Sequence, residues 1–436
     1  MTASPGSTWW SCSQALARVS PFRGLRFNPA LVDLGSVLSP PYDVIGPELQ
    51  AELYGRALQN VVRLELGRDY PDDRAGERDR YTRAHEHLRA WLEEGVLVQD
   101  DAPSIYVHEH RFPAPDGTVG TRLGCFVAVQ PVGYDRREVL RHELTLSGPR
   151  QDRVRLLEAT GVQTSAVMLL YEGASEVTEE LRRLAAQAQP TDQATVPGES
   201  GPEHHRLWRL SDPARLEAIC QALGASRLFI ADGHHRYETA LSLGLPGVLS
   251  LMAPLDDPGN LILPTHRVLP QSTRNLMELA TGLLGVGWEV ERRQRPLSQT
   301  LEEIARRRAA QHAFGIGDGE ATVVAARPRT GEGIRSPRAQ LDVAVLGTEI
   351  LGAHLGIAAA DASAGRLLYL RSAQEALRQA AAHRGLAFLL NPTTVAEMAA
   401  VASAGEAMPQ KSTYFFPKVP AGLVLLPGGG PAPVIV

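Results

Sequence analysis

The stretch LFIADGHHRYETAL, Leu228 to Leu241, runs from apolar residues through a dense polar group into a helix-like segment. It predicts a buried strand, a tight turn at Gly233 and the first turn of a helix. Glycine permits backbone conformations that residues with a β-carbon resist. Such a junction gathers free backbone N–H groups at one spot, and this geometry favours an anion.

The polar group itself supplies five candidate phosphate-binding residues: Asp232, Gly233, His234, His235 and Arg236. The arginine offers a forked donor for phosphate oxygens, and the two histidines can donate hydrogen bonds or carry a proton as catalytic groups. A polar helix cap formed by the aspartate is the structural alternative. A metal site is less favoured, because adjacent histidines lack the i, i+4 spacing that puts two ligands on one helix face.

The length and composition of the chain are those of an ordinary globular protein. Its 436 residues suggest two domains, and 44 basic against 49 acidic residues give a net charge of -5. That balance disfavours nucleic acid as a partner, and the absence of a long apolar run predicts no membrane span. Three scattered cysteines without a CxxC pair, and no signal-peptide pattern at the N-terminus, favour a cytoplasmic location.

Hydrophobic periodicity predicts a mixed α/β fold of α+β character, with mixed sheets and flanking helices. A flexible extension is expected at 1–18, an α+β lobe at 19–172, a poorly ordered connection at 173–203, and an α/β lobe carrying the DGHHR motif at 204–436. Helices are expected at 43–58, 80–94, 211–226, 371–385 and 394–406 and over most of 273–312, and strands at 60–66, 104–112, 121–132, 165–172, 204–210, 248–254, 261–269, 387–390 and 421–427.

Five further polar blocks could reach the same site. RHELTLSGPRQDR (141–153) combines basic, acidic and imidazole groups, although a solvated loop is the commoner outcome for such a run. LPTHRVL (263–269) places a His-Arg pair in an apolar strand, where polar groups must be satisfied. QKSTYFFPK (410–418) offers lysines, hydroxyls and aromatic rings. SPPYDVI and NVVRLELG add carboxylates near element ends. The candidates taken from these blocks are His142, Glu143, Arg153, His266, Arg267, Lys411, Ser412, Tyr414, Tyr42, Asp43 and Glu65.

Taken together and in this order, PFRGLRFNP, SPPYDVI, NVVRLELG, HELTL, LFIADGHHRYETAL, LPTHRVL and KSTYFFPK resemble the domain-of-unknown-function 1015 family, from about Val19 to Pro427. The DGHHR block is similar to the phosphate-binding signature of the ParB/sulfiredoxin-like superfamily, which includes nucleotide hydrolases and a kinase of free serine. The resemblance implies a ParB/sulfiredoxin-like element around this loop and phosphoryl chemistry on a small metabolite such as serine.

Phosphoryl transfer needs cationic donors on the phosphate, usually Mg²⁺, and a base for the attacking hydroxyl. We therefore assign Arg153, Arg236, Arg267 and Lys411 to phosphate. The expected catalytic groups are Glu65, His142, His234 and His235, and the expected substrate contacts are Tyr42, Asp43, Glu143, His266, Ser412 and Tyr414. Mg²⁺ with ATP or ADP are the possible cofactors, and no resident metal is expected. The chain lacks a GxxxxGK[ST] loop and the protein-kinase motifs.

Four functions stay open at this point. The first is a nucleotide-dependent kinase of a small molecule such as serine, and the second a phosphatase acting on a phosphometabolite such as phosphoserine. The third is a ParB-like nucleotide- or nucleic-acid-binding regulator. The fourth is a metal-dependent hydrolase that uses Asp232, His234, His142 and His266. A small phosphorylated ligand is the expected partner, no membrane is involved, and a homo-oligomer is left open.

Overall fold

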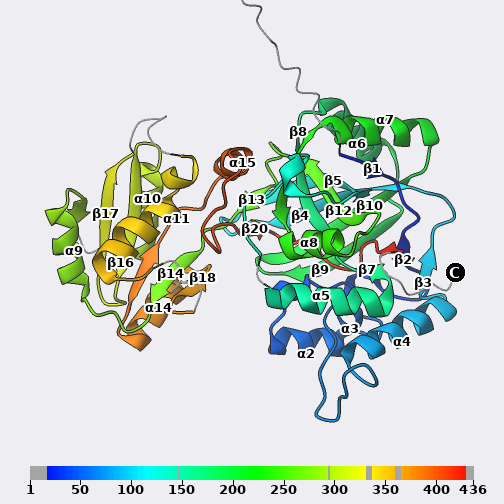
Figure 1. Cartoon of the computed structure of the whole chain (residues 1–436), viewed down its shortest axis with the longest axis horizontal. Helices are drawn as coiled ribbons and strands as arrows, with labels where there is room; N and C mark the ends of the chain where they lie inside the picture. The colour runs from blue at the N-terminus through cyan, green and yellow to red at the C-terminus, as the bar shows by residue number, and fades with distance from the viewer. Residues whose placement is uncertain (1–16, 146, 293–294, 330–335, 359–364, 429–436) are drawn as a thin grey trace, which may run out of the picture.

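A computed structural model describes residues 17–145, 147–292, 295–329, 336–358 and 365–428, which form two lobes, each around its own sheet (Figure 1). The fold is the predicted mixture of helices and mixed sheets. Residues 1–16 of the predicted flexible extension lie outside the described part of the chain.

The larger lobe contains a nine-stranded sheet. Most neighbours in it are antiparallel, while β11–β6 and β12–β8 are parallel. Its path runs β6 (Val139–Leu140), β11 (Arg227–Asp232), β8 (Val167–Glu172), β12 (Val248–Pro254), β5 (Val119–Val129), β4 (Ile105–Pro113), β10 (Gly201–Leu210) and β9 (Asp192–Gly198), with β1 (Val19–Ser20) beside β5.

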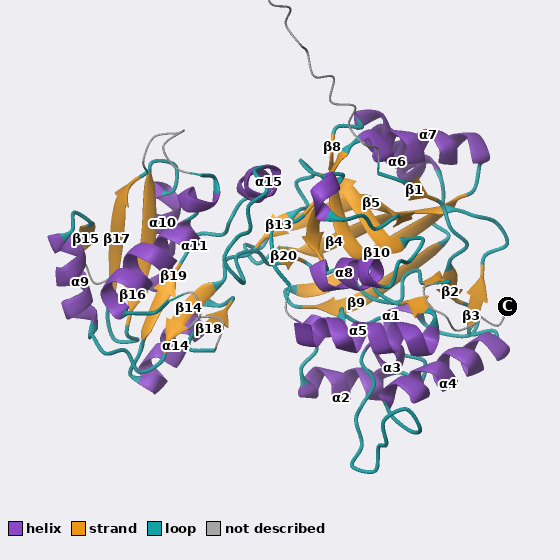
Figure 2. Cartoon of the chain, viewed as in Figure 1, coloured by secondary structure: helices purple, strands orange, loops and turns teal. Residues whose placement is uncertain are grey.

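Helices cover this sheet, as Figure 2 shows. One stack runs from α4 through α5 to α8, which packs on β8 and β12. This stack places the first turn of α8 over the carboxyl end of β11. The helices of the lobe are α1 (Leu34–Val37), α2 (Pro47–Arg56), α3 (Val62–Glu65), α4 (Arg80–Glu93), α5 (Ser147–Thr160), α6 (Ser175–Gln187), α7 (Pro213–Ala225) and α8 (His234–Ser242), with 3₁₀ turns η1 (Tyr42–Val44) and η2 (Tyr134–Arg136).

The smaller lobe contains a six-stranded antiparallel sheet in the order β15 (Glu289–Glu291), β17 (Thr322–Pro328), β16 (Gln311–Gly317), β19 (Leu386–Leu389), β14 (His266–Leu269) and β18 (Leu368–Leu370). The helical elements are α9 (Leu276–Gly285), α10 (Leu297–Arg307), η3 (Arg338–Gln340), α11 (Asp342–Val345), the π-helix η4 (Leu346–Gly352), α12 (Ala353–Leu355), α14 (Ala373–His383) and α15 (Val395–Ser403).

The chain leaves the larger lobe once and returns to it near its C-terminus. The outgoing β13 (Leu261–Ile262) pairs with the returning β20 (Phe415–Phe416). Beyond β20 the chain crosses the large sheet, and β21 (Leu426–Pro427) pairs with β7 (Val162–Gln163). A further short pair joins β2 (Leu25–Phe27) to β3 (Leu97–Gln99). The returning segment therefore lies beside motifs that are far away in sequence.

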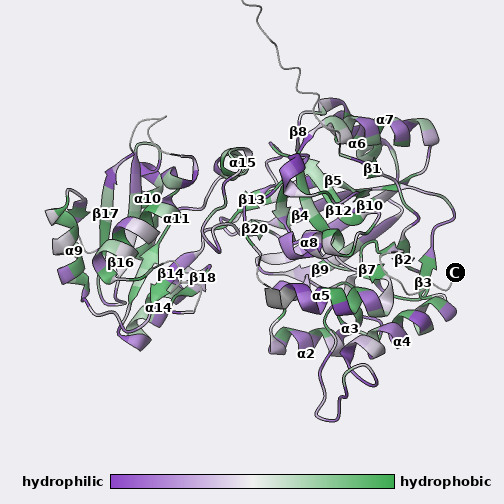
Figure 3. Ribbon diagram, in the orientation of Figure 1, coloured by the Kyte–Doolittle hydropathy of each residue, from purple (hydrophilic) through white to green (hydrophobic). Residues whose placement is uncertain are grey.

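Apolar residues concentrate on the central strands and the inner helix faces, as the green ribbon in Figure 3 shows. The largest buried cluster continues from one sheet to the other and includes Phe126 of β5, Phe415 of β20 and Phe388 of β19. In the described segments no helix combines the length and apolar character needed to cross a bilayer.

Several expected elements differ from the structure. The predicted strand at 60–66 is instead helix α3, which begins where Asn60 Oδ1 accepts a hydrogen bond from the Val62 amide at 3.0 Å. The apolar run 261–269 is divided at Pro264 into β13 and β14, which belong to different sheets. Residues 173–203 were expected to form a poorly ordered connection, but they contain α6 and β9. Because β10, β11 and β12 lie in the same sheet as β4 and β5, the sheets do not divide at residue 204.

Candidate functional site

The DGHHR segment adopts the strand, turn and helix that its sequence predicts. β11 ends at Asp232, Gly233 has a φ of +92°, and α8 begins at His234 without a side-chain cap among the residues described. A β-carbon on Gly233 would lie 3.0 Å from the Arg236 guanidinium, so the turn needs glycine for both its backbone angle and this close approach. The alternative role of Asp232 as a helix cap is therefore wrong, since its carboxylate is paired elsewhere.

Asp232 is paired with two cations. Its Oδ2 accepts a hydrogen bond from Arg236 Nη2 at 2.8 Å, and its Oδ1 accepts one from Lys418 Nζ. Burial acts to raise the pKa of this carboxyl, but Lys418 and Arg236 outweigh burial and hold the pKa below its usual range. Asp232 is therefore ionised, and its charge fixes both cations beside the first turn of α8.

Two more carboxylates complete what we call the Asp232 cluster, made of Asp43, Glu143, Asp232, Arg236 and Lys418. Asp43 lies on η1, 3.9 Å from Lys418 Nζ, and is half exposed. Burial raises the pKa of Glu143, while the nearby Lys411 lowers it. The cluster is therefore a charged group in which one carboxyl, that of Glu143, has a raised pKa and holds a proton more readily than a free glutamate does.

Two buried imidazoles flank the cluster. The rings of His142 and His234 meet edge to face with centroids 4.6 Å apart, and His142 Nε2 lies 2.9 Å from Thr413 Oγ1. Burial lowers the pKa of His142 to about 4 and holds that of His234 well below its usual value. Both rings are therefore neutral, and His234 Nε2 has no hydrogen-bond partner within the described ranges. One ligand atom each from His142, Glu143 and His234 lie within 4.8 Å of one another.

Glu65, expected to be a catalytic base, occupies a structural position. It is fully buried and accepts hydrogen bonds from Ser165 Oγ at 2.8 Å, from the Tyr42 amide at 3.2 Å and from Thr164 Oγ1. Arg153 Nη1 lies 3.5 Å away. Since its oxygens are engaged on all sides, the carboxylate orients the loop at Tyr42 rather than facing a substrate.

Arg153, assigned to phosphate from the sequence, packs its guanidinium 4.0 Å from the centre of the Tyr42 ring and donates to the Glu65 carbonyl oxygen at 2.8 Å. Both the Arg153 and the Arg236 charges act on Tyr42, whose pKa burial raises to about 12. These residues therefore form the wall of the site on its α5 side.

Two candidates from the smaller lobe, Arg267 and His266, make contacts away from the Asp232 cluster. Arg267 lies 4.8 Å over the Tyr369 ring and donates to the Lys411 carbonyl oxygen at 3.0 Å, so it supports the Lys411 backbone. His266 is buried in β14 and accepts a hydrogen bond from the Leu390 amide at 3.2 Å. Neither side chain contacts the Asp232 cluster through any interaction found among the described residues.

The KSTYFFPK segment reaches the cluster with a different residue from those expected. The Ser412 hydroxyl donates to the Pro409 carbonyl oxygen and is buried. Tyr414 donates to Glu199 at 2.8 Å, and two cations lie over its ring: Lys418 Nζ at 4.8 Å and the Arg371 guanidinium at 4.4 Å from the centroid. Lys418, which the sequence analysis did not select, is the residue that binds Asp232. The sequence could have indicated it, because Lys418 is the second lysine of the QKSTYFFPK motif from which Lys411 was selected.

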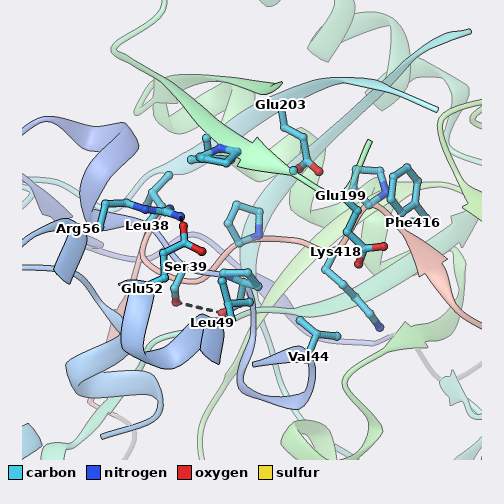
Figure 4. Close-up of a pocket in the computed structure, with 16 residues that line it drawn as sticks. Leu38, Ser39, Val44, Leu49, Glu52, Arg56, Glu199, Glu203, Phe416 and Lys418 are labelled. Carbon is cyan, nitrogen blue, oxygen red and sulfur yellow. Dashed lines mark hydrogen bonds and ion pairs between the residues drawn. The ribbon is translucent and has the colours of Figure 1, made fainter. Parts of the chain in front are cut away.

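A pocket of about 290 Å³ opens beside Lys418 (Figure 4). In that view Arg56 and Glu52 of α2 lie on one side and Glu199, Phe416 and Lys418 on the other. Its walls are more apolar than polar, and five charged side chains line it: Glu52, Arg56, Glu199, Glu203 and Lys418. The lining residues are Leu38, Ser39, Pro40, Val44, Leu49, Glu52, Arg56, Val196, Pro197, Gly198, Glu199, Glu203, Phe416, Pro417, Lys418 and Pro420.

Comparisons with known proteins identify the family. The sequence model described as "Protein of unknown function (DUF1015)" matches residues 19–344, and the chain belongs to that family. No curated protein sequence matches the chain.

Solved structures similar to the chain include a free serine kinase variant in complex with ADP, at 15% identity and a TM-score of 0.34, covering 67% of this chain and 87% of that one. A conserved hypothetical protein from Pyrococcus furiosus matches at 15% identity and a TM-score of 0.34, covering 68% and 93%. SbnI from Staphylococcus aureus, truncated at its C-terminus, matches at 15% identity and a TM-score of 0.33, and the match covers 67% of this chain and 84% of that one. Similarity at this level carries no inference about activity.

Proposed function

We propose that this member of the DUF1015 family is a phosphoryl-transfer enzyme acting on a small metabolite, with the phosphate group held at the first turn of α8. The observation that carries the proposal is the uncapped start of this nine-residue helix beside Lys418 and Arg236. The first N–H groups of a helix have no acceptor within the helix, and the helix dipole adds positive potential there. An anionic oxygen accepts hydrogen bonds from these N–H groups and is attracted by the positive potential.

The two cations retain donors for such a ligand. Lys418 has three N–H donors and gives one to Asp232. Arg236 Nε is buried and has no hydrogen-bond partner in the part of the chain described. A phosphate oxygen that takes these donors therefore adds contacts without breaking the ion pairs that hold the cations in place.

Proton transfer and metal binding fall to the carboxylates. Glu143, whose pKa is raised by burial, accepts the proton from an attacking hydroxyl. Asp43, whose charge acts on Glu143, and Glu143 itself would hold Mg²⁺, and the ion would neutralise charge that builds on the phosphate oxygens. His142 and His234 remain neutral and close the buried side of the site.

The pocket beside Lys418 favours a nucleotide as phosphoryl donor, and hence a kinase. Apolar walls from Val44, Val196 and Phe416 suit a base and sugar, while Lys418 faces the phosphates from the pocket's edge. The acceptor that we propose is free serine, with ATP as donor. A phosphatase needs no such pocket next to its phosphate site.

The test compares Lys418→Met with Arg371→Met, which removes the other cation that lies over the Tyr414 ring. Calorimetric titration uses Mg·ADP and phosphoserine as probes. We expect Lys418→Met to weaken binding at least tenfold, or about 1.4 kcal/mol, since a charged hydrogen bond contributes about 1.5–3 kcal/mol. Arg371→Met should stay within about threefold of the wild type.

Equal binding by the wild type and Lys418→Met would show that no phosphate lies at this turn. The direction of the reaction is read separately, from formation of phosphoserine and ADP from ATP and serine. Release of inorganic phosphate from phosphoserine without nucleotide would instead identify a phosphatase.

A further inference from the structure

A second polar group lies inside the large sheet, apart from the α8 site. β4 and β10 pair so that His110 lies directly opposite His205, with Glu203 two residues before it on the same face of β10. All three are buried, and one ligand atom from each lies within 4.8 Å of the others. We call these residues the sheet triad.

The three polar side chains lie on strands in the interior of the lobe, so they are not part of an exposed polar loop. The three side chains are buried, and a buried imidazole or carboxylate that lacks a full set of partners destabilises the fold. His205 Nε2 is buried and has no hydrogen-bond partner among all the described side chains and backbone groups. Such an unpaired nitrogen in a native interior calls for a ligand.

The other nitrogen of this ring is already engaged. His205 Nδ1 lies 3.1 Å from His108 Nε2, and the two rings stack with centroids 5.3 Å apart. When Nδ1–H donates to His108, the lone pair of His205 is left on the unpartnered Nε2. An outer partner of this kind orients ligand histidines in metal sites.

The triad brings together two imidazoles and one carboxylate, which are groups that bind transition metals. Room for the carboxylate exists because residue 198 is glycine: a β-carbon there would lie 2.1 Å from Glu203 Oε1.

We propose that His110, Glu203 and His205 bind a divalent transition-metal ion whose open positions face the pocket beside Lys418. Two imidazoles and one carboxylate suit zinc, manganese, iron(II) or cobalt, with ligand distances of about 2.0–2.2 Å. Glu203 lines the pocket and gives the ion a route from solvent. The remaining coordination positions are free for water or for a ligand in the pocket.

Metal binding requires one rearrangement. Arg122 Nη2 lies 3.2 Å from His110 Nδ1 and 3.0 Å from the Pro417 carbonyl oxygen, while His110 Nε2 donates to Glu203 at 2.9 Å. His110 must move its proton from Nε2 to Nδ1 before Nε2 can bind a metal, and Arg122 must then release Nδ1. Arg122 therefore opposes the ion, through this contact and through its charge.

The test is metal stoichiometry on the full chain. Protein stripped with a chelator is incubated with Zn²⁺, or with Mn²⁺ in a parallel sample, desalted and measured by elemental analysis against protein concentration. We expect His205→Ala and Glu203→Gln to hold one equivalent fewer than the wild type. His142→Ala, which alters the other histidine group, should retain that equivalent, and cobalt loading should give visible absorption bands that His205→Ala lacks.

A wild type that takes up neither ion, or a His205→Ala variant that binds as many ions as the wild type, overturns the proposal. Loss of the equivalent in His142→Ala but not in His205→Ala does so as well. Circular dichroism shows whether each variant is folded. Arg122→Met supplies a variant that should gain affinity, at least threefold by competition with a chromogenic chelator, and weaker binding there would contradict the assigned ligand set.

Discussion

The role of Glu65 gives the sharpest prediction about how the site is held. Its carboxylate accepts hydrogen bonds from Ser165, Thr164 and the Tyr42 amide and lies 3.5 Å from Arg153 Nη1, in a fully buried setting. We expect Glu65→Gln to destabilise the fold, and not merely to remove a proton acceptor.

The size of the effect follows from the contacts. Removing one partner of a buried ion pair destabilises a protein by about 3–5 kcal/mol. Arg153 keeps its hydrogen bonds to Asp152 and to the Glu65 carbonyl oxygen, which reduces the loss. The glutamine amide also retains one acceptor oxygen. We therefore expect about 2–3 kcal/mol for Glu65→Gln, and about 4–5 kcal/mol for Glu65→Ala, which leaves further donors unpaired.

Urea unfolding followed by circular dichroism measures these differences. Glu93→Gln is the matched control, because Glu93 is exposed and its Arg89 pair at 3.5 Å lies on the surface of α4. That change should alter stability by no more than about 0.5 kcal/mol. A Glu65→Gln variant as stable as the wild type would refute the positioning role and restore Glu65 as a candidate base.

Two further predictions concern acid stability and packing. Burial acts to raise the pKa of Asp100, but hydrogen bonds from Arg26 and Tyr106 hold it below the usual range. The stabilising effect of the Asp100 carboxylate is thus complete above about pH 4 and is lost as the pH falls through the folded-state pKa. The urea midpoints of the wild type and of Asp100→Asn should therefore converge below about pH 4. A constant difference between the two midpoints down to about pH 2 would contradict this. Gly259→Ala places a β-carbon 2.4 Å from the Thr121 carbonyl oxygen and should lower the melting temperature by several degrees, whereas Gly285→Ala, with nothing within 4 Å, should leave it unchanged or higher.

Local sequence signals predicted the elements that rely on local chemistry. The hairpin of β4 and β5 follows from alternating apolar residues around Asp116-Gly117, and α4 follows from an apolar stripe that includes Leu88 and Trp91. The strand, turn and helix at Gly233 are likewise encoded locally. Each of these segments buries one face and turns at a residue suited to the turn.

The errors arise where distant contacts override local preference. The β-branched residues at 61–62 favour a strand. Asn60, however, donates to the carbonyl oxygens of Ser36 and Leu38 and accepts from the Val62 amide, and the short helix that follows packs on α4. The polar sequence of 192–198 gave no strand signal. It forms β9 because β10 offers an edge with which it pairs.

The site could be predicted only in part for the same reason. The DGHHR turn and its neighbours Asp43 and Glu143 came from motifs, but Lys418 reaches Asp232 across 186 positions of sequence. The sheet triad had no motif at all, because His110 and Glu203 are 93 positions apart and meet only through the register of β4 and β10. Strand pairing, not spacing, brings such residues together.

The pocket joins the two proposed sites and makes them thermodynamically dependent on each other. Lys418 and Glu203 line the same pocket. An anionic ligand held by Lys418 therefore lies in the pocket that the open coordination positions of a metal at the triad would face. Attraction between that ligand and the ion raises the affinity of each. Because linkage is reciprocal, the factor by which Zn²⁺ tightens ADP binding must equal the factor by which ADP tightens Zn²⁺ binding. His205→Ala should therefore abolish the metal's effect on ADP while leaving metal-free ADP binding intact, and unchanged coupling in that variant would place the ion elsewhere.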